Sequence, residues 1–312
     1  MVEVGQRNMM DRFQQIEEEL QDVKALVSQL QREVEELRRE EDRRRHPVEV
    51  VLRQRGFPVL AHDASAQLLL SPDAPRSYRN AFYNLMKRYS FRLFLRDLIQ
   101  SPMGNDPAVL SRYCSMETVR SYLKSLSDLG VVETISGKGY RLIPNHVPSF
   151  GPTLEWYVCE IFQREFLSPA IFNVRLDCTR HGGDYDVLAV VAGFLACVEV
   201  KSSPPRGVEL PSVCAFWDRL GELDPHLAVF LVDTELRMKD KIVPLFEEAM
   251  SETSTGRRAL PVERLVDEIF HIGHAVYLAN SRKGIYSNLR CCVRDFLRRE
   301  RRPGGSPGRA VV

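Results

Sequence analysis

Residues that can bind a metal ion or move a proton gather around one apolar segment of the chain. Asp186 precedes the apolar residues 187–198, and Glu199 and Lys201 follow them. The content of Val, Leu and Phe and the central Ala192-Gly193 predict two adjacent strands joined by a tight turn. Because side chains alternate along a strand, Glu199 and Lys201 share one face, and the turn brings Asp186 opposite them. Ionised groups in an apolar setting are costly unless they are paired or bind a metal, so either ion pairs or a bound metal is expected here.

The pattern resembles that of the PD-(D/E)XK nucleases, a superfamily with an Asp, a short apolar stretch and then Glu-x-Lys on the next strand. Its members usually carry a further Glu on a preceding helix, and here a helix is predicted to open just after Pro152. Glu155 matches the position near the start of that helix, with Glu160 as the alternative. The resemblance covers residues 150–280.

The motif leaves alternatives open. Tyr185 stands where the superfamily often has Pro, a departure that it tolerates. Asp184 lies two residues before Asp186 and competes with it for the ligand role, and we prefer Asp186 because it directly adjoins the apolar segment. An apolar strand ending in Glu-x-Lys is also common as a solvated, salt-bridged strand end, which is the simpler interpretation.

The resemblance implies an α/β fold with a mixed central sheet flanked by helices, as in restriction endonucleases. It also implies a site for Mg²⁺, with Mn²⁺ as a substitute. The implied metal ligands are the carboxylates of Asp186, Glu199 and Glu155 and the backbone carbonyl of Val200, a set of oxygen atoms that suits Mg²⁺. Lys201 is implied to orient water or to stabilise charge that grows on the phosphate. Lys201, Glu199, Asp186 and Glu155 are therefore the candidate catalytic residues.

The composition describes a soluble globular protein of 312 residues with 44% apolar and 27% charged residues. The net charge of +1 excludes an indiscriminate polycation, so nucleic-acid binding has to come from local patches. Seven scattered cysteines favour reduced core thiols, and none has partners at zinc-ligand spacing. His271 and His274 are interpreted as ordinary strand or turn residues. No signal peptide or membrane helix is predicted, and we expect a cytoplasmic location.

The first 46 residues are predicted to form a coiled coil. Apolar residues recur at alternating spacings of four and three, which defines a heptad seam: Met9, Phe13, Ile16, Leu20, Val23, Val27, Leu30, Val34 and Leu37. The charges that face each other across a parallel pair are opposite in sign at Arg12–Glu17, Glu19–Lys24 and Glu33–Arg38. A single helix packed on its own body would need a wider apolar stripe. The pattern therefore favours a parallel homodimer.

Residues 78–147 are predicted to form a winged-helix domain. A helix is expected from Tyr78 to about Gln100, followed by a helix–helix–hairpin order. The predicted DNA contacts lie on the second helix of that order and on the wing: Arg120, Lys124, Lys138 and Arg141. These basic residues are few for a DNA-binding surface, so the alternative is a winged helix that packs against protein.

The remaining boundaries follow from composition. Residues 47–77 are assigned to a linker region, residues 148–296 to the nuclease-like domain and residues 297–312 to a basic disordered tail. The leading hypothesis is a metal-dependent DNA endonuclease. The alternatives are a non-enzymatic DNA-binding regulator that uses the nuclease fold as a scaffold, and a coiled-coil adaptor whose winged helix binds protein.

Removal of residues 1–46 tests the coiled coil. Because the seam is predicted to be the dimer contact, the truncated protein should be a folded monomer and the full chain a dimer. Light scattering with circular dichroism measures both properties. If the truncated protein remains dimeric, the coiled coil is not the dimer contact.

Overall fold

The structure is a computed structural model of the chain. The residues that it describes are 21, 23–24, 26–27, 29–30, 33, 45–63, 67–71, 73–104, 106–135, 139–143, 147–177, 179–180, 182, 184–253 and 260–300. The chain divides into two compact units, Met1–His46 and Pro47–Val312.

In the first unit, the described residues between 21 and 33 are helical. Val23, Val27 and Leu30 of the expected seam are exposed by 56%, 47% and 52%. A row of apolar side chains exposed on a single helix is suited to burial against a second helix. The other six seam residues lie outside the described residues, so the parallel dimer stays a prediction.

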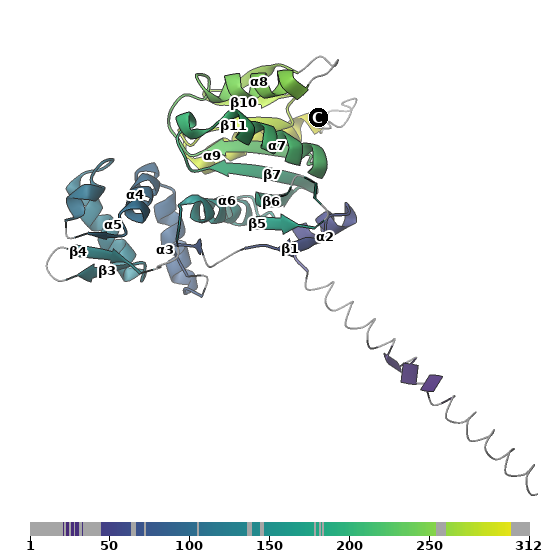
Figure 1. The fold of residues 1–312 in the computed structure, drawn as a ribbon, viewed down its shortest axis with the longest axis horizontal. Helices are drawn as coiled ribbons and strands as arrows, with labels where there is room; N and C mark the ends of the chain where they lie inside the picture. The colour runs from purple at the N-terminus through teal and green to yellow at the C-terminus, as the bar shows by residue number, and fades with distance from the viewer. Residues whose placement is uncertain are drawn as a thin grey trace, which may run out of the picture. The chain divides into compact units, whose positions relative to one another are not determined.

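A mixed eight-stranded sheet forms the centre of the second unit (Figure 1). Its strands in spatial order are β1 (Val59–Ala61), β5 (Ala170–Leu176), β6 (Tyr185–Val191), β7 (Phe194–Lys201), β8 (Leu227–Val232), β11 (Val276–Ala279), β10 (Ile269–Ile272) and β9 (Val262–Val266). Strands β7, β8 and β11 run parallel, and the other neighbouring pairs are antiparallel. Strand β8 is buried along its whole length, as expected for a parallel strand covered on both faces.

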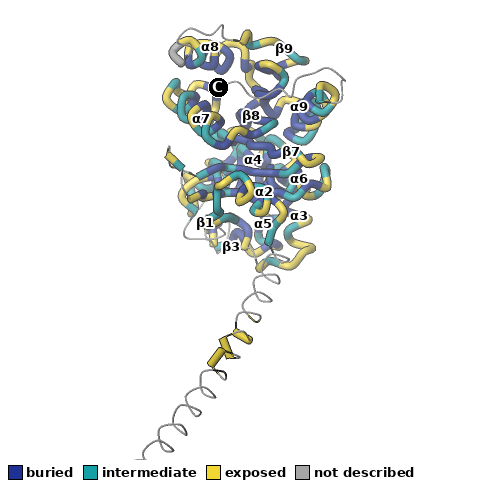
Figure 2. Tube along the Cα trace, turned by 90° about the vertical axis from the view of Figure 1, so that its right-hand side faces the viewer, coloured by how far each residue is buried: buried dark blue, intermediate teal, exposed yellow. Residues whose placement is uncertain are grey.

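Helices pack on both faces of this sheet. One face packs on α2 (Pro47–Gln54), α7 (Leu210–Leu223) and α8 (Ile242–Thr253), and the other packs on α6 (Gly151–Glu165) and α9 (Ile285–Glu300). Figure 2 shows the central strands β7 and β8 in the buried interior between these layers. The expected α/β class, a mixed sheet flanked by helices, is confirmed.

A second set of elements precedes α6 in the chain. It comprises α3 (Arg76–Met86), α4 (Tyr89–Gln100), β2 (Met103–Gly104), the 3₁₀ helix η2 (Pro107–Leu110), α5 (Met116–Asp128), β3 (Val132–Ile135) and β4 (Gly139–Leu142). Strands β2, β4 and β3 form a small antiparallel sheet. A helix followed by a hairpin is present as expected, and its membership of the winged-helix class stays a prediction.

The single helix expected from Tyr78 to about Gln100 is wrong. The chain breaks between α3 and α4, where Arg88 has an extended backbone conformation. The break lets the two helices pack on each other, with the rings of Phe82 and Phe91 meeting edge to face at 6.0 Å. Helical periodicity continued across the break and therefore did not mark it.

Two expected irregular regions contain regular structure. Residues 47–77 were assigned to a linker, but α2 buries Val48 and Leu52 completely and β1 pairs with β5 at the edge of the large sheet. Residues 297–300 were assigned to a disordered tail, but they continue α9. Short elements such as α2 and β1, which tertiary contacts stabilise, carry little periodic signal.

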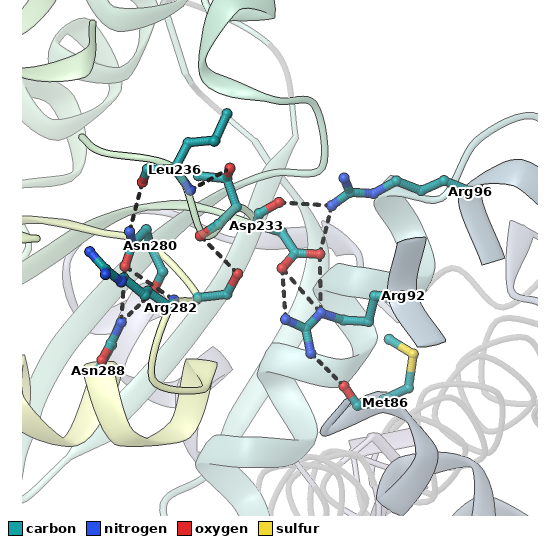
Figure 3. A network of polar contacts seen from close by, with 10 residues as sticks. Met86, Arg92, Arg96, Asp233, Leu236, Asn280, Arg282 and Asn288 are labelled. Atoms are coloured by element: carbon teal, nitrogen blue, oxygen red, sulfur yellow. Dashed lines mark hydrogen bonds and ion pairs between the residues drawn. The ribbon is translucent and has the colours of Figure 1, made fainter. Parts of the chain in front are cut away.

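A fully buried ion pair joins α4 to the large sheet (Figure 3). Asp233 directly follows β8, and both of its carboxylate oxygens accept hydrogen bonds from Arg92 at 2.8–3.1 Å. Arg96 donates to the same carboxylate at 2.6 Å, and Arg92 also donates to the carbonyl of Met86 at 2.7 Å. Burial raises the pKa of Asp233, but the charges and hydrogen bonds of the arginines outweigh burial and hold the pKa below its ordinary value. The carboxylate is therefore ionised and fixes α4 against the sheet.

Replacing Arg92 tests this connection. Arg92→Leu leaves the buried carboxylate of Asp233 paired with Arg96 alone. The free energy of unfolding, measured by urea denaturation, should therefore fall by roughly 3–5 kcal/mol. Arg92→Leu combined with Asp233→Leu should recover part of that loss because no buried charge remains. The control Lys283→Ala breaks the exposed pair with Asp267 and should cost less than about 1 kcal/mol. Equal losses in Arg92→Leu and the control would refute this role.

Candidate metal-binding site

The hairpin β6–β7 positions the candidate carboxylates. Val191 pairs with Phe194, so Ala192 and Gly193 form a two-residue turn, and both have positive φ angles of 50° and 87°. Such a turn matches the twist of the flanking strands, and glycine adopts its left-handed conformation readily. The predicted hairpin is confirmed. Because Val187 pairs with Val198, Asp186 lies beside the end of β7 where Glu199 and Lys201 are found.

Asp186 and Glu199 accept hydrogen bonds from residues at the end of β7. The Oδ2 atom of Asp186 accepts a hydrogen bond from the backbone N–H of Val200 at 2.6 Å. The Oε1 atom of Glu199 accepts one from Nζ of Lys201 at 2.7 Å. Glu199 is buried, whereas the side chain of Lys201 is 26% exposed and can reach a ligand from solvent.

Arg219 on α7 holds the second oxygen of Glu199. Its Nη2 atom lies 2.5 Å from Oε2, so both oxygens of Glu199 are paired with cations. The sequence analysis did not identify Arg219. The only available signal was a charged residue within a helix that is otherwise largely apolar, and this signal does not specify a partner.

Glu155 has the fewest hydrogen-bond and ion-pair partners of the three carboxylates. It is 9% exposed, and its Oε2 atom is buried without a hydrogen-bond partner. Burial raises the pKa of Glu155 to about 7, a hydrogen bond with Asn173 offsets part of the rise, and the charges of Glu199 and Asp184 add to it. Asn173, also missed from the sequence, has a left-handed conformation within β5 with φ 49°. A polar residue inside an apolar strand was its only signal.

The two alternative carboxylates form ion pairs of their own. Asp184 pairs with Arg175 of β5 at 3.1 Å and is still near enough to Glu155 for its charge to raise the pKa of Glu155. Glu160 pairs with Arg164 one turn further along α6. The structure thus brings together Glu155, Asp186, Glu199 and Lys201, whereas Glu160 forms its ion pair apart from them.

The charges of this cluster fit a divalent cation. Among the described residues, Glu155, Asp186 and Glu199 lie near the cations Lys201 and Arg219, and Asp184 lies near Glu155, so the carboxylates outnumber these two cations. Burial and the charges of Glu199 and Glu155 raise the pKa of Asp186 well above its ordinary value, although the hydrogen bond from Val200 opposes the rise. Mg²⁺ favours carboxylate oxygens, and ligands must lose their protons to bind a metal. Glu199 can coordinate an ion if Lys201 or Arg219 moves away and leaves one carboxylate oxygen free to bind it.

The predicted DNA-binding residues that the structure describes lie on α5 and on the β3–β4 hairpin. Arg120 and Lys124 are exposed on α5. Arg141 lies opposite Glu133 across the β3–β4 hairpin and pairs with it at 2.5 Å, so part of its charge is neutralised. Lys138 lies outside the described residues.

A cleft of about 600 Å³ opens beside the ends of β7 and β8. One wall comes from α4 and the segment after η2, and the other comes from the segments that follow β7 and β8. Its lining includes Tyr89, Arg96, Arg112, Tyr113, Arg206 and Glu235. Arg112 and Arg206 are exposed, and such cations beside tyrosine rings suit contacts with phosphates and bases.

Comparisons with known proteins give distant structural likenesses. The crystal structure of protein VC1899 from Vibrio cholerae has 16% sequence identity and a TM-score of 0.40, over 56% of this chain and 51% of that one. The structure of Can2 from Sulfobacillus thermosulfidooxidans in complex with cyclic tetra-adenylate has 13% identity and a TM-score of 0.33, over 60% and 50%. This chain thus matches about half the length of each. At this degree of similarity neither structure assigns a function to the chain.

No protein-family model and no curated protein matches the chain. Among the described residues, no helix has both the length and the apolar character needed to cross a membrane.

The raised pKa of Glu155 gives a pH-dependent stability. Between pH 4.5 and about 7 the folded protein keeps a proton on Glu155 that the unfolded chain has released, so the free energy of unfolding falls as pH rises. Without a divalent ion, Glu155→Gln should be more stable than wild type at pH 8 by roughly 1–3 kcal/mol and similar to it at pH 4.5. Denaturant unfolding at both pH values measures this difference. A constant difference between the two proteins would contradict the raised pKa.

Proposed function

We propose that the chain is a Mg²⁺-dependent nuclease that hydrolyses phosphodiester bonds in DNA, with Mn²⁺ able to substitute. The observation that carries this proposal is the meeting of Glu155, Asp186 and Glu199 with Lys201 at the end of one hairpin. The buried Oε2 atom of Glu155, which has no hydrogen-bond partner, and the raised pKa values of Glu155 and Asp186 support this proposal. The resemblance of the motif to that of PD-(D/E)XK nucleases suggests the type of reaction, which is hydrolysis of a phosphodiester bond.

Each residue has a separate proposed role. The carboxylates of Asp186, Glu199 and Glu155 and the carbonyl of Val200 hold the ion. Mg²⁺ supplies positive charge that polarises the scissile phosphate and makes nearby water more acidic. Lys201, partly exposed and held by Glu199, donates a hydrogen bond to the attacking water or to the phosphate oxygen where negative charge grows.

We propose that the nucleic acid binds in the cleft beside β7 and β8. Pro204 and Arg206, which follow Lys201 in the chain, line its wall. Arg206 and Arg112 can bind phosphates there, and the ion pairs of Asp233 with Arg92 and Arg96 keep the α4 wall in place. Contacts of this type predict that binding weakens steeply as salt increases.

One observation favours a non-enzymatic DNA-binding regulator as the second candidate. Both oxygens of Glu199 are already paired with Lys201 and Arg219, so the hairpin end has cationic partners without a metal. In that case the cluster stabilises the fold, and DNA binds through the cleft or through α5.

Two substitutions separate ion binding from catalysis. Asp186→Asn removes a ligand charge, so Mg²⁺ affinity measured by calorimetry and the single-turnover rate of DNA cleavage should both fall. Lys201→Ala removes no ligand, so ion and DNA binding should persist while the cleavage rate falls by about 10²–10³-fold. The control Lys283→Ala should keep all three properties.

The same assays can refute the proposal. A wild-type protein that binds DNA but neither binds Mg²⁺ or Mn²⁺ nor cuts DNA would support the regulator. A wild-type protein that binds neither DNA nor a divalent ion would support the protein-binding adaptor.

A further inference from the structure

A cluster of two histidines and a glutamate lies at the far end of the large sheet from the β6–β7 hairpin in strand order. His271 on β10 is opposite Glu263 on β9, and His274 follows in the turn that leads to β11. One possible ligand atom from each of these three residues lies within 4.8 Å of the others. The Nε2 atom of His271 is 3.8 Å from Oε2 of Glu263, and the two imidazole rings stack with centroids 3.7 Å apart.

Asp295 orients the second of these histidines. Its Oδ2 atom lies 2.6 Å from Nδ1 of His274 and also accepts a hydrogen bond from the hydroxyl of Tyr277 at 2.9 Å. A carboxylate on Nδ1 fixes the tautomer of the ring, keeps the proton on that nitrogen and leaves Nε2 with a free lone pair. This is the outer-shell arrangement that metal-binding histidines commonly have.

We propose that Glu263, His271 and His274 form a binding site for a Zn²⁺-class divalent ion. Two imidazole nitrogens and one carboxylate oxygen are borderline ligands that suit Zn²⁺ and other late first-row ions far better than Mg²⁺. Asp295 is the positioning residue for His274.

Burial and access both suit ion binding. The side chain of His271 is 5% exposed, so this ligand is held inside the fold between β9 and the turn that carries His274. Glu263 is 60% exposed, which leaves an entry path and a coordination position open to water.

Ion binding requires a local movement of the rings. The lone pair of an imidazole nitrogen lies in the ring plane, whereas the rings are stacked with only 23° between their planes. They must rotate to direct both nitrogens at one ion, and the weak 3.4 Å contact from the His274 N–H to Nδ1 of His271 is given up. The bound ion then links β9, β10 and, through Asp295, α9.

This site is independent of the proposed nuclease function. It uses nitrogen ligands from β10 and the following turn, whereas the hairpin site uses only oxygen ligands from α6, β6 and β7. Loss of Zn²⁺ binding leaves Mg²⁺ binding intact, and the reverse also holds.

Titration of the full chain with Co²⁺ and Zn²⁺ tests the proposal. Co²⁺ absorption distinguishes nitrogen and oxygen ligands from thiolates, which matters because Cys291 is only partly buried. Glu263→Gln alters an exposed residue and should fold normally. Glu263→Gln and Asp295→Asn should each weaken binding of the ion, Asp295→Asn by about 10–100-fold. The control Asp267→Asn, a nearby exposed carboxylate outside the cluster, should bind as wild type does.

The expected result is one high-affinity Co²⁺ or Zn²⁺ ion per chain, without thiolate bands, that excess Mg²⁺ does not displace. Nuclear magnetic resonance should show the His271 and His274 ring signals shift with the ion, and the same shifts should require a higher ion concentration in Glu263→Gln. Absence of binding, thiolate bands, or equal affinity in Glu263→Gln and wild type would each overturn the proposal.

Discussion

The constraint on which the candidate site depends is the burial of carboxylates with too little positive charge around them. Glu155, Asp186 and Glu199 converge from a helix and two strands, and Lys201 and Arg219 are the cations that contact the set directly. Burial in a low-dielectric interior penalises the charged form, so the pKa values of Glu155 and Asp186 are raised. A fold can keep such an arrangement at lower cost if a divalent ion completes it.

Two features of the second unit set the positions of the elements around these groups. The tight turn at Ala192-Gly193 sets the register of β6 and β7, and a slip by one residue would turn Asp186 to the opposite face. Asp233, at the end of the neighbouring strand β8, binds Arg92 and Arg96 and so fixes α4 beside the same strand ends. The ion pairs of Asp233 join the two walls of the cleft, α4 and the segment that follows β8.

The sequence predicted the parts of the site that depend on local patterns. Strand alternation and the Ala-Gly turn were sufficient for the hairpin. Glu155 was reached only through resemblance to a family, since its helix lies well before the hairpin in the chain. Arg219 and Asn173 were missed because contacts between distant segments leave no periodic signal. Arg92 and Asp233 are separated by 141 positions, and nothing in the sequence indicates that they meet.

The central claim is that the cluster at the end of β7 is a divalent-metal site. Anomalous diffraction from crystals grown with Mn²⁺ tests it most directly. The account predicts a Mn²⁺ peak that would be held by oxygens of Asp186 and Glu199, with Glu155 bound directly or through water and one cationic partner of Glu199 displaced. Crystals with saturating Mn²⁺ that show no peak there, with Lys201 and Arg219 still paired to Glu199, would contradict it.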